Sequence, residues 1–131
     1  MKQSPLLHFE SSAFPVATNE DTETNPGIHG KSLAMWLSEE LRKVGRPAGS
    51  VFAEDFGWCV PIESSPHKLY VTCSSGGKAN EWQVFAFAEG GFMARVLGRD
   101  KSAESVASLF TAVRRCIESV PDVRNLSEEA G

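Results

Sequence analysis

The chain has 131 residues, a length that fits one domain and can bury a sizeable core without a metal or a disulfide. With 41% hydrophobic residues, 23% charged residues and a net charge of −4, it is globular in composition and lacks the basic surface of a nucleic-acid-binding protein. No segment resembles a signal peptide or reaches the about 20 apolar residues of a membrane span, so we expect a single cytoplasmic domain over residues 1–131 with no membrane partner.

The first predicted elements are a short strand over residues 6–9 and a helix that follows an acidic loop at residues 17–25. The loop lacks apolar side chains and is expected to be solvated. Asn25 and Pro26 form a helix-start signal, because an Asn side chain can cap free amides and proline suits the first helical turn. An apolar stripe with helical spacing follows: Leu33, Trp36, Leu37, Leu41 and Val44.

The middle of the chain changes to the alternation that is typical of strands. We expect one long strand over residues 51–62, with a bulge or an edge position at Gly57 and Pro61. A second strand is expected over residues 69–73. Two further strands, over residues 82–88 and 92–97, are joined by the hairpin signal Gly90-Gly91.

A second helix follows, with Asp100 or Ser102 as its cap and Pro121 at its end. Its apolar stripe consists of Val106, Leu109, Phe110, Val113, Ile117 and Val120. The polar tail over residues 122–131 is expected to fray, which leaves an ordered core of about 6–120. The order β-α-β-β-β-β-α predicts an α+β fold, a two-layer sandwich of two helices on a mainly antiparallel sheet of four or five strands.

The expected Gly90-Gly91 hairpin separates the two faces of the sheet. It places Phe85 and Phe87 under the helices, together with Phe92, Ala94 and Val96. The opposite face is unusually apolar, with Arg95 as its charge. It is either covered by the N-terminal segment, or a homodimer interface, or a groove for a small ligand. The candidate dimer face consists of Trp82, Val84, Ala86, Met93, Arg95 and Leu97.

Two other segments are candidate sites. Glu54, Asp55 and Trp58 combine carboxylates with an aromatic ring and are candidates for binding a basic partner, although solvated acids beside a packed tryptophan are the plainer interpretation. On a strand, Glu54 and Asp55 point to opposite faces and cannot act as a catalytic pair. His29 and Lys31, at the expected helix start, are candidates for an anion or ligand site, with Tyr70 as a further member.

No catalytic motif or metal site is predicted. Cys59, Cys73 and Cys116 are expected to be reduced thiols, because the chain has no export signal. The histidines are too scattered to form a metal site, and the Gly76-Gly77-Lys78 loop leads to a strand rather than to the helix of a phosphate-binding loop. We therefore expect no cofactor, and an enzyme is the less favoured interpretation.

The run Asn25-Pro26-Gly27-x-x-Gly30-Lys31-x-Leu33-Ala34-x-Trp36-Leu37, followed by Glu54-Asp55-x-Gly57-Trp58, resembles a family of small uncharacterised bacterial domains of unknown function. That resemblance implies no activity and no site residues. Our leading hypothesis is a non-enzymatic protein-binding module that forms a homodimer and offers acidic surface to a basic partner. Immunity proteins and secretion chaperones are analogous in size and acidity. The alternative is a small-ligand-binding domain, or an enzyme with a pocket between the helices and the sheet.

Overall fold

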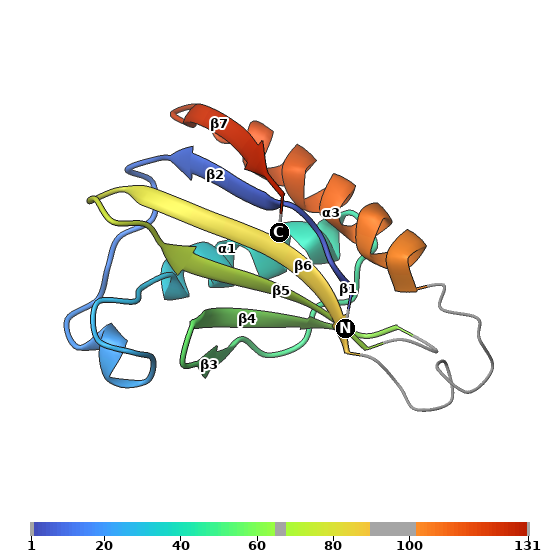
Figure 1. Ribbon diagram of the computed structural model, residues 1–131, viewed down its shortest axis with the longest axis horizontal. Helices are drawn as coiled ribbons and strands as arrows, with labels where there is room; N and C mark the ends of the chain where they lie inside the picture. Colours follow the sequence, from blue (N-terminus) through green and yellow to red (C-terminus); the bar gives the residue numbers. More distant parts are fainter. Residues whose placement is uncertain (1, 65–67, 90–101, 131) are drawn as a thin grey trace.

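A computed structural model describes residues 2–64, 68–89 and 102–130. Two long helices lie on one face of an antiparallel sheet, so the predicted α+β sandwich is confirmed, although the described residues form seven strands and not the four or five predicted (Figure 1). The helices are α1 (Lys31–Lys43) and α3 (Ser102–Glu118), and a short 3-10 helix, η1 (Glu20–Thr22), precedes α1. The strands are β1 (Lys2–Gln3), β2 (Leu6–Glu10), β3 (Phe52–Glu54), β4 (Gly57–Ile62), β5 (Lys68–Ser75), β6 (Glu81–Glu89) and β7 (Arg124–Glu129).

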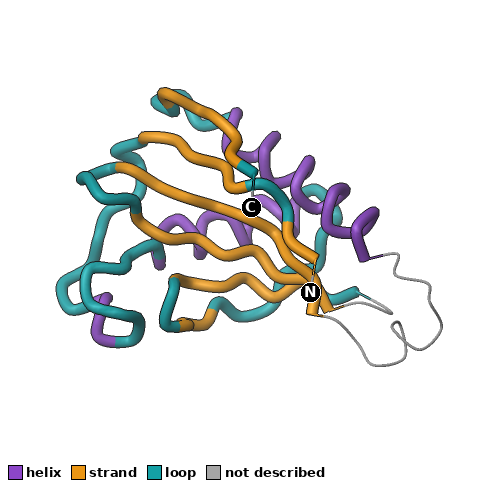
Figure 2. The backbone as a smooth tube through the Cα atoms, in the orientation of Figure 1, coloured by secondary structure: helices purple, strands orange, loops and turns teal. Residues whose placement is uncertain are grey.

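The sheet has the order β3-β4-β5-β6-β2-β7, and β1 pairs with β6 beyond the end of β2. Every pair is antiparallel. Figure 2 shows both long helices behind the sheet, which leaves the other sheet face toward the viewer. Within the described residues, no helix is both long and apolar enough to cross a membrane. The predicted hairpin at Gly90-Gly91 and the strand over residues 92–97 lie outside the described residues.

Helix α1 carries the predicted apolar stripe but begins later than predicted. Leu33, Leu37 and Leu41 are fully buried, whereas Val44 is 59% exposed. The Asn25-Pro26 signal was misleading, because the chain turns through this segment and the helix starts only at Lys31.

Glu20, in the acidic loop, explains this start. Its Oε2 atom accepts the amide protons of Gly30, at 2.7 Å, and of Lys31, at 2.9 Å. Its Oε1 atom accepts the amide proton of Ala17 at 3.1 Å. A carboxylate is a favourable acceptor for the free amides of a helix N-terminus. Glu20 is only 5% exposed, so the expectation of a fully solvated acidic loop is wrong at this residue.

The long strand predicted over residues 51–62 is in fact a hairpin. β3 and β4 pair with Glu54 opposite Gly57, and Asp55 and Phe56 form the turn between them. The sequence suggested a bulge at this glycine, but a two-residue turn reverses the chain here instead. The acidic pair therefore lies at the tip of a hairpin.

The two faces of β6 are the reverse of the prediction. Trp82, Val84, Ala86 and Ala88 are at most 2% exposed and belong to the core, whereas Phe85 and Phe87 lie on the face away from the helices and are half-buried. On the helix side Val84 pairs with Leu7 and with Cys73, and the small side chains of Ala86 and Ala88 let the helices approach the strand. The alternation of residues could not show which face of β6 packs against the helices, because both faces are apolar and a shift of one residue exchanges them.

The C-terminal segment, predicted to fray, forms the edge strand β7. It pairs with β2, with Leu6 opposite Glu129 (Figure 1). Side-chain contacts hold the α3–β7 connection and β7 itself against the rest of the fold. Asp122 accepts hydrogen bonds from Ser11 Oγ at 2.6 Å and from the Ser12 amide at 2.8 Å, and Arg114 pairs with Glu128. Strand pairing satisfies the backbone here although most β7 side chains are exposed.

Candidate functional site

The sheet face opposite the helices carries a continuous row of aromatic rings. The rings of Phe52 and Tyr70 meet edge to face at 6.1 Å between centroids, those of Tyr70 and Phe87 stack at 5.1 Å, and those of Phe87 and Phe85 lie at 5.8 Å. The row crosses from β3 through β5 to β6, and both long helices lie on the other side of the sheet (Figure 1). Contacts of this kind fix the rings relative to one another.

Phe56, at the tip of the β3–β4 hairpin, extends this row. Its side chain is 49% exposed, and it lines a mainly apolar cavity of about 220 Å³ together with Gln3, Phe85 and Phe87. We call Phe52, Phe56, Tyr70, Phe85 and Phe87 the aromatic face.

Two small side chains lie buried within the same sheet face. Cys59 is opposite Phe52 in the β3–β4 register, and Thr72 is opposite Phe85 in the β5–β6 register. They are 0% and 1% exposed, and Cys59 Sγ lies 3.5 Å from Thr72 Oγ1. Burial raises the pKa of the Cys59 thiol. The surrounding rings therefore form a small second core, and the thiol within it is protonated at neutral pH.

Carboxylates border the aromatic face. Glu54 and Asp55 are exposed on the hairpin, and Glu89, at the end of β6, accepts a hydrogen bond from the Tyr70 hydroxyl at 3.3 Å. Burial raises the pKa of Tyr70, and the negative charge of Glu89 raises it further. We call Glu54, Asp55 and Glu89 the acidic rim. Lys68, opposite Glu89 in the β5–β6 register, is a basic residue beside it.

The predicted partner site is divided by the sheet. Glu54 borders the aromatic face, but Trp58 points to the helix side and is 3% exposed. Lys31 Nζ lies 5.1 Å from the centroid of the Trp58 ring. Trp58 Nε1 is buried with no hydrogen-bond partner among the described residues. Trp58 is therefore a core residue, and only the two acids of this group are available on the surface.

The residues of the predicted anion site are not brought together either. The His29 amide donates to Ser75 Oγ at 3.0 Å, and the His29 ring lies 4.0 Å from Asp21. The Lys31 amide, at the start of α1, already donates its hydrogen bond to the Glu20 carboxylate. Tyr70 belongs to the aromatic face, five positions before Ser75 along β5. The Glu20 carboxylate therefore occupies the helix N-terminus at which a bound anion was predicted.

Three of the six residues of the predicted dimer face lie on the other side of the sheet. Trp82, Val84 and Ala86 are buried under the helices and cannot contact a second copy. Met93, Arg95 and Leu97 lie outside the described residues. An apolar second face does exist, but other residues of β6 form it together with residues of β3 and β5.

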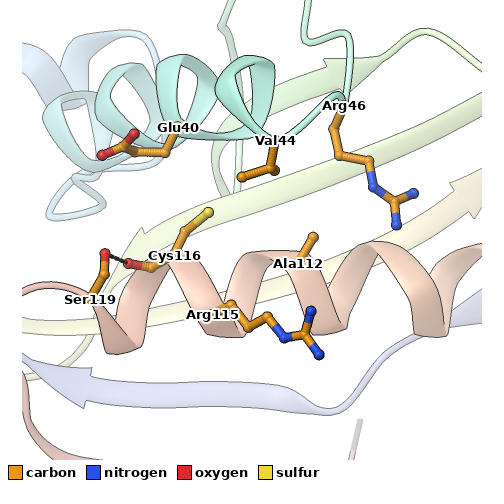
Figure 3. Close-up of a pocket in the computed structure, with 7 residues that line it drawn as sticks. All are labelled: Glu40, Val44, Arg46, Ala112, Arg115, Cys116 and Ser119. Carbon is orange, nitrogen blue, oxygen red and sulfur yellow. Dashed lines mark hydrogen bonds between the residues drawn. The ribbon is translucent and has the colours of Figure 1, made fainter.

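A groove of about 360 Å³ runs between α1 and α3 on the helix layer (Figure 3). Glu40 lies toward one end and the guanidinium groups of Arg46 and Arg115 toward the other. Arg46 is held in place by Ser108, with Nη2 2.6 Å from the hydroxyl oxygen. Burial raises the pKa of the Cys116 thiol, which is therefore a poor nucleophile at neutral pH. The remaining lining residues are Val44, Ala112 and Ser119.

No group of three or more histidine, cysteine or acidic side chains is placed to hold a metal ion among residues 2–64, 68–89 and 102–130. The three cysteines are free thiols. Sequence reasoning missed Phe52 and Phe56 as site residues. The sequence signal was that Phe52 and Phe56 flank the carboxylates Glu54 and Asp55, and adjacent carboxylates are typical of an exposed turn.

Comparison of the chain with protein-family models, with curated proteins and with solved structures finds no match. The resemblance to small bacterial domains stays a prediction.

Proposed function

We propose that this chain is a protein-binding module that docks a partner protein on the aromatic face. The observation that carries the proposal is a row of contacting rings on a sheet face with both described helices on its other side. Contiguous apolar patches on protein surfaces mark interaction sites, and aromatic residues are enriched among the residues that dominate binding energy. Because the rings already contact one another, a partner would order few side chains on binding.

The titratable groups beside the rings favour binding over catalysis. The pKa values of Tyr70 and Cys59 are both raised, so each side chain is protonated at neutral pH and neither can serve as a general base. The acidic rim residues Glu54 and Asp55 are exposed to water. This arrangement supplies contact area and charge.

The test is photo-crosslinking in the native cells. p-Benzoylphenylalanine in place of Phe87 keeps an aromatic ring on the face, and the same residue in place of Met35, which is 51% exposed on α1, is the control. We expect an adduct of discrete mass from position 87 and none of that mass from position 35. An adduct with twice the mass of the chain would identify the partner as a second copy. The same adducts from both positions, or none from position 87, would contradict the proposal.

The groove between α1 and α3 favours a second candidate, the binding of a small anion. Arg115 has no ion-pair partner in the described part of the chain, and Ser108 positions Arg46 at the same end. Two guanidinium groups can together bind a carboxylate or a phosphate. Citrate and inorganic phosphate should raise the melting temperature, and Arg115→Gln should abolish that rise. An unchanged melting temperature with either ion would exclude this candidate.

A further inference from the structure

The cavity beside Phe56 gives the aromatic face an anchor point. It is bordered by the rings of Phe56, Phe85 and Phe87, with Gln3 as its polar side, and its volume is about 220 Å³. Anchor residues in protein interfaces are large side chains inserted into pockets of this kind. The cavity therefore suits one large apolar side chain of a partner.

The acidic rim lies beside this anchor point. The Glu54 and Asp55 side chains have no ion pair or hydrogen bond in the described residues, and Glu89 accepts only the Tyr70 hydroxyl. Glu89 contacts the Tyr70 hydroxyl directly, and its charge raises the pKa of Tyr70 more than that of the more distant Glu54 does. Although Lys68 lies opposite Glu89, the carboxylates have the greater share of charge near this ring, and a cation placed over it would be attracted by both the ring and the carboxylates.

A second copy of this chain would supply the wrong charge. Two aromatic faces placed against each other would bring two acidic rims together, and like charges across an interface oppose association. Arginine fits better than lysine, because its planar guanidinium stacks on aromatic rings and pairs with carboxylates in a bidentate manner.

We infer that the partner presents a protein segment in which a large apolar side chain lies next to an arginine. The apolar side chain enters the cavity between Phe56 and Phe87, and the guanidinium lies over Tyr70 beside Glu89, with Glu54 adding attraction at longer range. This inference rests on the proposed function and specifies the chemistry of its partner.

The experiment is a selection from a displayed library of random peptides on the full chain. Selected peptides are then measured by fluorescence polarisation against the wild-type chain, against Glu54→Gln/Glu89→Gln, and against a matched control, Glu23→Gln/Glu104→Gln, which changes the net charge equally at exposed positions elsewhere. We expect peptides that combine arginine with a large apolar residue. The rim variant should weaken binding by about threefold, the effect of one exposed ion pair with Glu89 and a longer-range attraction to Glu54, and high salt should do the same.

Face variants separate this inference from the proposed function. Phe87→Ser, and Phe56→Ser at the exposed turn in case the first variant is unstable, should abolish binding of the selected peptides. Peptides without arginine, or equal affinity for the rim variant and its control, would overturn the inference while leaving the face as a docking surface. Peptides insensitive to both phenylalanine variants would overturn the proposed function as well.

Discussion

Glu20 and Lys31, eleven positions apart in sequence, are joined by a hydrogen bond of 2.9 Å from the Lys31 amide to the Glu20 carboxylate. This contact attaches the loop that contains η1 to the start of α1. The carboxylate accepts the amide protons of Ala17 and Gly30 as well, so one buried side chain satisfies three backbone donors. The loop and the helix should therefore lose their structure together.

Replacement of Glu20 tests this dependence. We expect Glu20→Ala to lower the free energy of unfolding by about 2 kcal/mol, because buried amides lose their acceptor. Glu23→Ala, three residues later and exposed, should change it by less than about 0.5 kcal/mol. Urea denaturation followed by circular dichroism gives both values. Equal effects of the two substitutions would show that the carboxylate does not hold the helix start.

Gly30 and Gly57 both approach the Cys73 carbonyl oxygen closely. A Cβ atom would lie 2.6 Å from it at Gly30 and 2.7 Å from it at Gly57, and the φ of Gly30, +143°, is one that L side chains rarely adopt. We expect Gly30→Ala to destabilise the chain by about 3 kcal/mol, whereas Gly77→Ala, with nothing within 4 Å, should be nearly neutral. Thermal unfolding of the two variants checks this, and a neutral Gly30→Ala would contradict the close contact.

Asp122 gives the fold a dependence on acid. Hydrogen bonds from Ser11 and Ser12 hold the pKa of its carboxyl below the ordinary value of 3.8. Because the folded state has the lower pKa, this stabilisation is fully present above 3.8 and is lost as the pH falls through the folded value. Asp122→Asn should therefore lower the urea midpoint at neutral pH and reduce its fall in acid. If the midpoints of the variant and of the wild type fall in parallel, Asp122 makes no such contribution.

The thiols should report global unfolding. Cys73 is fully buried and burial raises its pKa strongly, and burial also raises the pKa values of Cys59 and Cys116. The thiolate is the reactive form, so all three should react with a disulfide reagent much more slowly than free cysteine at neutral pH. Denaturant should release all of them together. Rapid reaction of Cys73 in the folded protein would contradict its place in the core.

The elements with strong periodicity could be predicted from the sequence. Leu33, Leu37 and Leu41 identified α1, and the stripe from Val106 to Ile117 identified α3. The start of α1 could not be predicted, because its capping carboxylate, Glu20, lies eleven positions before Lys31 and meets the helix only when the loop folds back.

The sequence predicts that the sheet has a second apolar face, but it does not identify the residues of the aromatic face. The sequence predicts an apolar second face on β6. Both alternating sets of residues in this strand are largely apolar, so the alternation does not show which set packs under the helices. Phe52 and Phe56 were missed because the sequence predicts one bulged strand here and not a hairpin whose turn contains Phe56. The pairing of β3 with β4 decides this, and local sequence does not encode it alone.

The position of β2 has a consequence for how the chain acquires its structure during synthesis. Strand β2 lies between β6 and β7, and β7 follows β2 by more than a hundred residues in the chain. Until β7 has been synthesised, β2 has an unpaired edge, and unpaired edges are the sites at which nascent chains associate wrongly. The sheet can therefore be completed only after β7 has left the ribosome, and the interval before that is when a chaperone would be most useful.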